Sequence, residues 1–287
     1  MAATRGEGPP GTAGTGVAVR VAVAGAGGRM GRALVEAVLA HPGLALVAAL
    51  DVPGSPALGH DAGEACGRAT GVVVASDVDA ALARADVVID FTRPDGTLAH
   101  LAACVRHRVA AVVGTTGLDA AQKSALAGFG REIPIVFAAN MSVGVNVLLS
   151  LVESAARALG PAFDVEIVEM HHRHKVDAPS GTALRLGEAA AAGAGVTLGE
   201  HAVYARHGVT GERKAGTIGF ATLRGGDVVG EHMVVFAGNG ERLELAHRAT
   251  SRQLFAAGAL RAVEFVAARR ARGEHGVFDM PEVLGLS

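Results

Sequence analysis

The first half of the chain alternates short apolar runs with stretches of helical periodicity, and this alternation restricts the possible folds more than any other feature. In one such stretch, residues 96–108, Leu98, Leu101 and Val105 recur at helical spacing. Asp95 is the N-cap that we predict for this helix. The runs themselves are too continuously apolar for half-exposed strands, so we expect a doubly wound parallel sheet covered on both faces. The predicted strands are 18–24, 44–50, 71–75, 87–91, 109–114 and 133–137.

The pattern changes after Asn140. A long helical stretch, a strand candidate, a polar loop and an alanine-rich helix follow one another, at 143–159, 163–170, 171–181 and from Thr182 onward. Three later runs have the character of antiparallel strands, and glycine-rich turns at 225–227 and 238–240 separate them. These runs are 217–223, 228–236 and 242–247. A final helix is expected from Arg252.

Composition excludes several classes of function. A net charge of −2 and an aromatic content of 3% argue against nucleic acid or an anionic membrane as a partner. The chain has two cysteines, which fits a reducing compartment, and it has no uninterrupted apolar run of membrane-spanning length. We therefore expect a cytoplasmic protein. Residues 1–17 are predicted to be a disordered tail rather than a signal peptide, because the apolar run after them contains Arg20.

The first predicted strand runs into GAGGRMG, residues 25–31, ahead of a predicted helix. Glycines in such a turn let the backbone approach a pyrophosphate, and the helix N-terminus offers N–H groups and partial positive charge. The spacing is GxxGxxG, since Met30 occupies the third glycine position of the usual GxGxxG pattern. The turn therefore predicts a dinucleotide site, and the alternative is an ordinary glycine-rich turn.

Asp51 ends the second predicted strand, about 20 residues beyond the glycine turn. A dinucleotide-binding fold places the carboxylate that holds the ribose hydroxyls there. Val52 follows, so no arginine is present to neutralise a 2′-phosphate. This favours NADH over NADPH as the cofactor, although Arg29 could partly serve a phosphate. The alternative is that Asp51 only begins a loop.

Two further loops follow predicted strands, at 114–117 and 138–141. Because ligands of open α/β sheets sit outside the carboxyl ends of the strands, both loops are candidates to line the nicotinamide. The alternative for each is a plain strand-to-helix turn.

The segment EMHHRHKVDAPSGT, residues 169–182, concentrates three histidines, an arginine and a lysine before a predicted helix start. A cationic loop beside a helix N-terminus is a receptor for carboxylates, and histidine exchanges protons near neutral pH. The alternatives are a solvated basic face, a metal site and a nucleic-acid contact. We expect no metal, because the histidine run lacks the usual ligand spacing and has no cysteine nearby.

With these motifs in view, the chain resembles the 4-hydroxy-tetrahydrodipicolinate reductase (dihydrodipicolinate reductase) family of diaminopimelate and lysine biosynthesis. The resemblance extends from about Val19 to the C-terminus. The matching segments are VAGAGGRMG, DFTRP (90–94), VGTTG (113–117), ANMSVGVN (139–146), HHRHKVDAPSGTA (171–183), GTIGFATLRGGDVVGEH (216–232) and FDM (278–280).

The resemblance implies an NAD(P)H-dependent oxidoreductase that reduces 4-hydroxy-tetrahydrodipicolinate to tetrahydrodipicolinate with loss of water. It implies an N-terminal Rossmann-like domain at 18–142, to which 253–287 returns, and a C-terminal α+β domain at 143–252 with a mixed sheet for substrate binding and oligomerisation. The implied assembly is a homo-oligomer, a tetramer built through the sheets of that second domain, and the implied partner is a small dicarboxylate substrate.

The resemblance also implies roles for individual residues. His171 is the implied proton donor and acceptor, and Lys175 is the implied second proton donor. His172, Gly181 and Thr182 are the implied substrate contacts. The implied cofactor contacts are Gly25, Ala26, Gly27, Gly28, Arg29, Met30, Asp51, Gly114, Thr115, Thr116, Ala138, Ala139, Asn140 and Met141. Val52 departs from NADP-preferring members, which carry arginine there.

Two other functions fit part of the pattern. One is a different nicotinamide enzyme of similar build, although no nucleophilic cysteine lies in a loop that would suit a semialdehyde dehydrogenase. The other is a non-catalytic nucleotide sensor, which would have no need of both His171 and Lys175.

Overall fold

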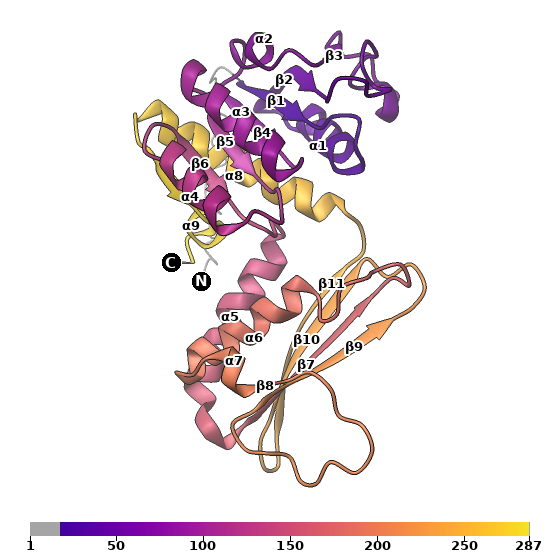
Figure 1. The fold of residues 1–287 in the computed structure, drawn as a ribbon, viewed down its shortest axis with the longest axis vertical. Helices are drawn as coiled ribbons and strands as arrows, with labels where there is room; N and C mark the ends of the chain where they lie inside the picture. Colours follow the sequence, from indigo (N-terminus) through magenta and orange to yellow (C-terminus); the bar gives the residue numbers. More distant parts are fainter. Residues whose placement is uncertain (1–17, 287) are drawn as a thin grey trace, which may run out of the picture.

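The computed structural model describes residues 18–286, so the predicted disordered tail lies outside the described residues. A seven-stranded sheet forms the upper part of Figure 1, with strand order β12-β6-β5-β4-β1-β2-β3 and every pair parallel. Its first elements are β1 (Val19–Ala24), α1 (Arg29–Ala40), β2 (Leu44–Leu50), the 3-10 turn Glu64–Cys66, β3 (Val74–Ala75) and α2 (Val78–Leu82). They are followed by β4 (Val87–Asp90), α3 (Pro94–His107), β5 (Ala110–Val113), α4 (Ala120–Phe129) and β6 (Pro134–Phe137).

Helices cover both faces of this sheet, as predicted for a doubly wound fold. On one face, Leu34 and Val38 of α1 join a buried core that also contains Val263. On the other face, Leu82, Leu101 and Leu126 bring α2, α3 and α4 onto the sheet. One detail of the prediction was wrong. The N-cap of α3 is Arg93 rather than Asp95, because Pro94 takes the first helical position, where its missing N–H costs nothing.

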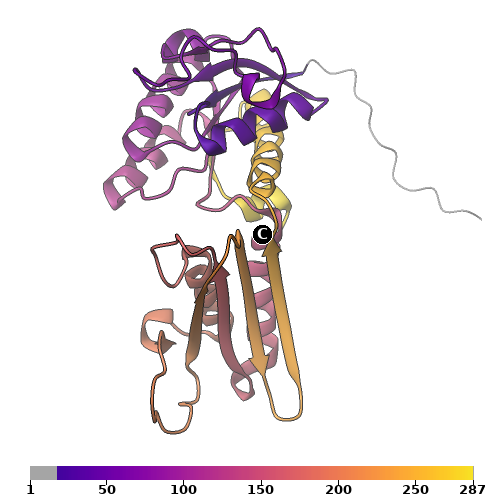
Figure 2. The ribbon, with the colours of Figure 1, turned by 90° about the vertical axis from the view of Figure 1, so that its right-hand side faces the viewer.

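The second sheet has five strands in the order β11-β10-β7-β9-β8. Its elements are α5 (Val143–Leu159), the 3-10 turn Gly160–Ala162, β7 (Asp164–His171), α6 (Gly181–Ala194), α7 (Leu198–His201), β8 (Ala202–Val203), β9 (Ile218–Arg224), β10 (Gly230–Ala237) and β11 (Arg242–Ala249). Helices α5 and α6 lie along one face, and the strands line up beside them (Figure 2). The sheet is mixed, as predicted.

The predicted antiparallel pairing of β9 with β10 was wrong. β7 lies between the two strands, parallel to β9 and antiparallel to β10, so residues 225–227 connect strands that do not pair. The pairing of β10 with β11 through residues 238–240 is the predicted hairpin, with Ala237 opposite Arg242. This order places β7 at the centre of the sheet, where both of its edges are paired.

The chain then returns to the first sheet. α8 (Gln253–Ala271) packs against α1, β12 (Gly276–Phe278) pairs in parallel with β6, and α9 (Met280–Leu284) follows. The elements around the first sheet form the first part of the molecule, and those around the second sheet form the second part. Within the first part, α8 passes close to the segment before α5, where a Cβ on Gly258 would lie 1.7 Å from the carbonyl oxygen of Met141. Glycine at 258 is therefore required for the helix to pass the segment that leads into α5.

By length and hydropathy alone, residues Val143–Ala162 could span a membrane. This helix also carries Glu153 and Arg157, and it places Leu148 and Val152 in the buried core under the second sheet. A core helix passes the same test of length and composition, so this feature is weak evidence for a membrane segment.

Candidate active site at the junction of the two parts

The strand order of the first sheet reverses at β1, which pairs with β2 on one side and β4 on the other. A pocket of about 690 Å³ opens at the carboxyl ends of these strands, lined by Gly25, Gly28, Asp51, Val52, Thr92, Arg93 and His100, among others. Gly25 has a positive φ of 70°. Gly31 has no room for a side chain, because a Cβ would lie 2.0 Å from the Gly25 carbonyl oxygen. The glycine turn thus packs α1 tightly against β1.

Asp51 closes one side of the glycine turn. Its Oδ2 accepts a hydrogen bond from the Gly27 backbone N–H at 2.9 Å, and its Oδ1 accepts one from Val52 N–H at 2.8 Å. A Cβ on Gly27 would lie 2.6 Å from Asp51 Oδ2, so glycine is needed for the approach. The Val52 side chain is 67% exposed. The predicted carboxylate and the predicted turn therefore lie together.

A buried polar network lies under the same pocket. Asp90 is 1% exposed, and its carboxylate accepts hydrogen bonds from the hydroxyl of Thr92 at 2.6 Å and from the backbone N–H of Thr92 at 2.9 Å. His100 Nδ1 lies 2.8 Å from the other Asp90 oxygen. Thr115, from the predicted loop 114–117, bonds to Thr97 at 2.7 Å. The network fixes the ends of β4 and β5 relative to each other.

The loops after β5 and β6 line a neighbouring pocket of about 450 Å³. Thr115, Thr116, Ala138 and Ala139 contribute to its wall, together with Arg185 of α6. Thus the predicted nicotinamide loops meet the second part of the molecule. Met141 differs from its neighbours, because its side chain is 1% exposed and belongs to the core of the first part.

His171 is the last residue of the central strand β7, and its ring is held through Nδ1 by Glu169. Its Nδ1 lies 2.5 Å from Oε2 of Glu169, which points to the same face of the strand two residues earlier. Glu169 is 1% exposed, and Arg224 donates to both of its oxygens at 2.8 and 2.9 Å. The Ser180 backbone N–H adds a fourth contact at 3.0 Å.

The charges in this cluster set the protonation states. Burial alone would raise the pKa of Glu169, but hydrogen bonds from Arg224 and His171 lower it below its usual value. Burial lowers the pKa of His171, and the bond to Glu169 partly opposes this. Burial also lowers the pKa of His232 to about 4. Glu169 is therefore ionised at neutral pH, and His232, whose ring centroid lies 5.1 Å from that of His171, is uncharged.

Ser180 is the N-cap of α6, and its side chain accepts a hydrogen bond from the Ala183 N–H at 3.1 Å. Its hydroxyl also lies 3.0 Å from His232 Nε2. Gly181 and Thr182 form the first turn of the helix, with Gly181 exposed and Thr182 half-buried. Their free N–H groups and the partial positive charge of the helix end are suited to a carboxylate.

Lys175 lies in the loop between β7 and α6. Its Nζ donates to both carboxylate oxygens of Asp177, at 2.7 and 2.8 Å, and it lowers the pKa of that carboxyl. His172 is half-buried, and its Nδ1 has no hydrogen-bond partner among the described residues. The charge of Lys175 also contributes to the lowered pKa of His171.

One small pocket, of about 50 Å³, joins the two parts of the molecule. Asn140 reaches it from the first part, and His171, Thr182, His232 and His247 reach it from the second. Asn140 Nδ2 donates to Thr182 Oγ1 at 3.1 Å. The volume suits one or two water molecules. The structure therefore brings three predicted site residues together at the junction, whereas His172 and Gly181 do not line this pocket.

Arg29 and Met30 lie in the first turn of α1, where Met30 packs against the first core and Arg29 is exposed. Neither lines the pocket beside Asp51. Sequence reasoning missed Glu169, Arg224 and His232. Glu169 could have been found, because residues two apart in a strand share a face. Arg224 and His232 could not, because they reach the site only through strand pairing, opposite His171 and Glu169 respectively.

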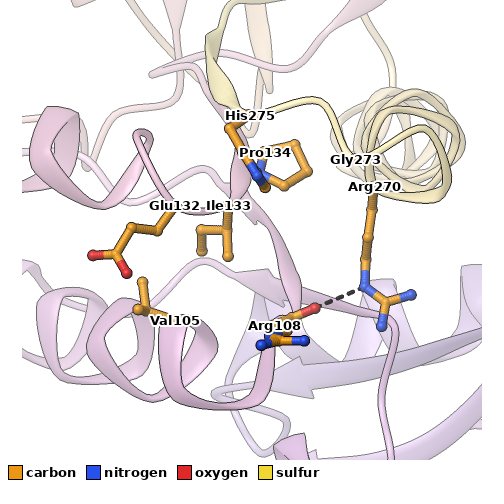
Figure 3. A pocket seen from close by; sticks show the side chains of 8 residues that line it. All are labelled: Val105, Arg108, Glu132, Ile133, Pro134, Arg270, Gly273 and His275. Carbon is orange, nitrogen blue, oxygen red and sulfur yellow. Dashed lines mark hydrogen bonds between the residues drawn. The ribbon is translucent and has the colours of Figure 1, made fainter.

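A further pocket, of about 620 Å³, lies at the opposite edge of the first sheet (Figure 3). Its lining residues precede or begin β5, β6 and β12, and Arg270 crosses it to donate to the Arg108 carbonyl oxygen at 2.7 Å. The amino ends of parallel strands are not where open α/β sheets bind ligands. Among residues 18–286, no group of three or more metal-ligating side chains is found.

Comparisons with known proteins agree with this geometry. Residues 19–141 match the family model for the N-terminus of dihydrodipicolinate reductase, and residues 144–284 match the model for its C-terminus. The chain is 58% identical over 268 residues to the 4-hydroxy-tetrahydrodipicolinate reductase of Burkholderia multivorans, covering 93% of this chain and 100% of that protein. It is 59% identical to the reductase of Laribacter hongkongensis, covering 93% and 98%.

Among solved structures, the chain is similar to the dipicolinate-bound dihydrodipicolinate reductase of Paenisporosarcina sp. TG-14. The TM-score is 0.72 with 26% identity, covering 93% of this chain and 99% of that one. An NAD-complexed protein of gentamicin biosynthesis shares the fold, with a TM-score of 0.61 and 15% identity, covering 98% of this chain and 94% of that one. The chain belongs to the dihydrodipicolinate reductase family.

Proposed function

We propose that this chain reduces 4-hydroxy-tetrahydrodipicolinate with one hydride from NADH or NADPH and one proton, giving tetrahydrodipicolinate, the oxidised cofactor and water. The observation that carries the proposal is the junction pocket. There His171 and Thr182, from the segment 169–182, face Asn140, from a loop at the carboxyl edge of the nucleotide-type sheet. We propose domain limits of 18–142 together with 253–287 for the cofactor part and 143–252 for the substrate part.

The proposed substrate contacts lie at the start of α6. A substrate carboxylate would accept hydrogen bonds from the N–H groups of Gly181 and Thr182, where the helix end supplies partial positive charge. The unpartnered Nδ1 of His172 is a further proposed contact. Lys175 supplies positive charge close by, which suits a substrate with two carboxylates.

We assign the proton transfers to His171 and Lys175. His171 is buried beside the junction pocket, and Lys175 is held at the surface by Asp177. After water is lost, the substrate is a conjugated imine. Hydride then adds at the ring carbon that carried the hydroxyl. The proton from His171 is taken up by the resulting substrate anion and completes the reduction. Positioned proton transfer of this kind is typically worth 10²–10⁴-fold in rate.

The residues of the first sheet fit a nicotinamide dinucleotide, which supplies the hydride when it is bound. The glycine turn at 25–31 admits close backbone approach to a pyrophosphate, and Asp51 stands where ribose hydroxyls would be held. We propose that Thr115, Thr116, Ala138 and Ala139 hold the nicotinamide end. NADH is the proposed preference, because a 2′-phosphate would meet the Asp51 carboxylate and the next residue is the apolar, exposed Val52 rather than an arginine.

We propose a homotetramer built through the second sheet, in the cytoplasm. Helices cover only one face of that sheet. On the other face, Met233 of β10 pairs with Val168 of β7, and Val235 lies two residues further along β10. These three side chains form an apolar strip, which partly buried charged side chains flank. In addition, β11 is an edge strand whose outer backbone groups lack a strand partner in the described chain.

The test is oxidation of NADH and NADPH by the purified protein, with substrate generated in place from pyruvate and aspartate semialdehyde by the preceding synthase. Substrate-dependent oxidation is expected, with a higher kcat/KM for NADH. A folded protein that binds NADH but oxidises neither cofactor would point to a nucleotide sensor or to a different imine substrate.

A further inference from the structure

We infer that Glu169 is a positioning residue for His171: it accepts the Nδ1 proton and so leaves Nε2 as the nitrogen that serves the reaction. This inference deepens the proposed function and rests on it only for the identity of the reaction. The geometry itself concerns the buried cluster of Glu169, His171 and Arg224.

The direction of the hydrogen bond follows from the partners of Glu169. Its carboxylate already accepts two hydrogen bonds from Arg224 and one from the Ser180 N–H, so it is held ionised and can only accept. The remaining contact, to His171 Nδ1 at 2.5 Å, therefore requires that Nδ1 carry the proton. A neutral His171 then has its lone pair on Nε2.

The position of Nε2 matches this assignment. A Cβ on Gly230 would lie 3.0 Å from His171 Nε2, so glycine at 230 leaves that side of the ring open. Gly230 and His171 both line the junction pocket. A side chain at 230 would fill the space in which a substrate atom or a water molecule could meet Nε2.

Several charged or titratable groups act on His171. Glu169 lies on its own strand, Arg224 on β9, His232 on β10 and Lys175 in the following loop. The Glu169 carboxylate favours the imidazolium, while Arg224 and Lys175 disfavour it. His232 is uncharged near neutral pH. His247, on β11, also lines the pocket, and burial lowers its pKa. Glu169 is thus the one neighbour among these that stabilises the imidazolium form of His171, in which Nε2 carries a proton as well as Nδ1.

Arg224 fixes the carboxylate rather than the imidazole. Besides its two bonds to Glu169, it donates to the carbonyl oxygens of Leu223 and Asp177 at 2.6 and 2.7 Å. It therefore joins the end of β9 to the loop that carries Lys175. The fork geometry of the guanidinium matches both carboxylate oxygens, which the ammonium of a lysine could not do.

The first experiment needs no substrate and measures the tautomer in the wild-type protein. Nitrogen-15 NMR of histidine-labelled protein would report the tautomer of each neutral imidazole, with His171→Gln used only to assign the signal. We expect His171 to be protonated on Nδ1 above its pKa. Protonation on Nε2 would overturn the inference, whatever the enzyme's activity.

The second experiment follows the pH profile of Glu169→Gln. If protonated His171 gives the proton, kcat/KM falls as pH rises through its pKa. Loss of the Glu169 charge should therefore move this fall to lower pH, because the carboxylate raises the pKa of His171. At neutral pH we expect kcat to fall roughly 10–100-fold, with unchanged NADH affinity. Arg224→Lys should give a smaller effect in the same direction.

Asp86→Asn is the matched control, because Asp86 is also a carboxylate bonded to two arginines, Arg20 and Arg270, but at the amino edge of the first sheet. It should lower stability and leave the profile unchanged. An unshifted profile for a folded Glu169→Gln protein would contradict the inference. An inactive wild-type protein would instead refute the proposed function, and the tautomer measurement would still decide the role of Glu169.

Discussion

Asn140 and Thr182 are bonded directly across the junction of the two parts, with Asn140 Nδ2 donating to Thr182 Oγ1 at 3.1 Å. Asn140 is itself fixed, because its Oδ1 accepts from the Ser142 N–H at 2.9 Å and its carbonyl oxygen accepts from Asn146 Nδ2 at 3.0 Å. The first turn of α6 is therefore positioned against a loop that follows β6. This contact couples the proposed substrate end of the site to the proposed cofactor end.

Thr182→Val should weaken this coupling while keeping the shape of the side chain. Loss of one hydrogen bond to a half-buried amide costs about 1 kcal/mol, so we expect KM for the substrate to rise roughly 5- to 10-fold with little change in NADH affinity. Steady-state kinetics with both substrates varied would measure this. Thr197→Val, at an exposed threonine whose side chain makes no capping hydrogen bond, is the control. Equal KM values for the two variants would argue against a role for the Asn140–Thr182 contact.

His171→Gln should lose most of the rate and little of the cofactor binding. Without a proton donor at this position, kcat is expected to fall by 10²–10⁴-fold. NADH affinity, measured by fluorescence titration, should stay near the wild-type value, because His171 lies outside the glycine turn and the pocket beside Asp51. A variant that turns over at the wild-type rate would remove His171 from the mechanism.

Val52→Arg should shift cofactor use toward NADPH. The Val52 side chain is exposed beside Asp51, so an arginine there could reach a 2′-phosphate without disturbing the core. A charge-assisted hydrogen bond is worth about 1.5–3 kcal/mol, so kcat/KM for NADPH should rise at least 10-fold. Val73→Arg, at another exposed valine of the same domain, should leave the NADH/NADPH ratio unchanged. The assignment of Val52 fails if both variants keep the wild-type ratio.

Met233→Glu should reduce the size of the assembly. The substitution places a charge in the apolar strip on the uncovered face of the second sheet, next to Val168. Burying an unpaired carboxylate at an interface is strongly unfavourable. Light scattering after size-exclusion chromatography should therefore report a smaller mass than for the wild-type protein, and Val73→Glu should not change the mass. An unchanged mass for Met233→Glu would place the interface elsewhere.

Elements with a regular pattern were predicted from the sequence alone. The bounds of β2 and α5 coincide with the predicted ranges, because hydrophobic periodicity marks them clearly and Ser142 caps the start of α5. β3 is two residues long rather than five, since only Val74 and Ala75 pair with β2. The turn at 238–240 signals the pairing of β10 with β11, but nothing in the sequence signals that β7 lies beside β9, and that parallel pairing was missed for this reason.

The same limit applies to the candidate site. The motif around His171 is local, so its residues could be named before the fold was known. Arg224 lies 53 positions later and reaches the site only because β9 pairs in parallel with β7, so that it stands opposite His171. Sequence reasoning therefore finds the groups that would contact a substrate more readily than the groups that hold them in place.

Arg108→Gly should stabilise the protein. Arg108 is the one non-glycine residue with positive φ among residues 18–286, at 52°, where it ends α3 in the left-handed region. That conformation costs an L-residue about 1–2 kcal/mol, part of which glycine recovers, although glycine also loses more freedom on folding. We expect a gain of about 0.5–1 kcal/mol, measured by chemical unfolding. Arg108→Ala is the control: it removes the long side chain but keeps the Cβ, so it should give no gain. In both variants the carbonyl oxygen of residue 108 can still accept the hydrogen bond from Arg270 Nε. If both variants have the same stability, the left-handed conformation carries no measurable strain and the Arg108 side chain accounts for any difference from wild type.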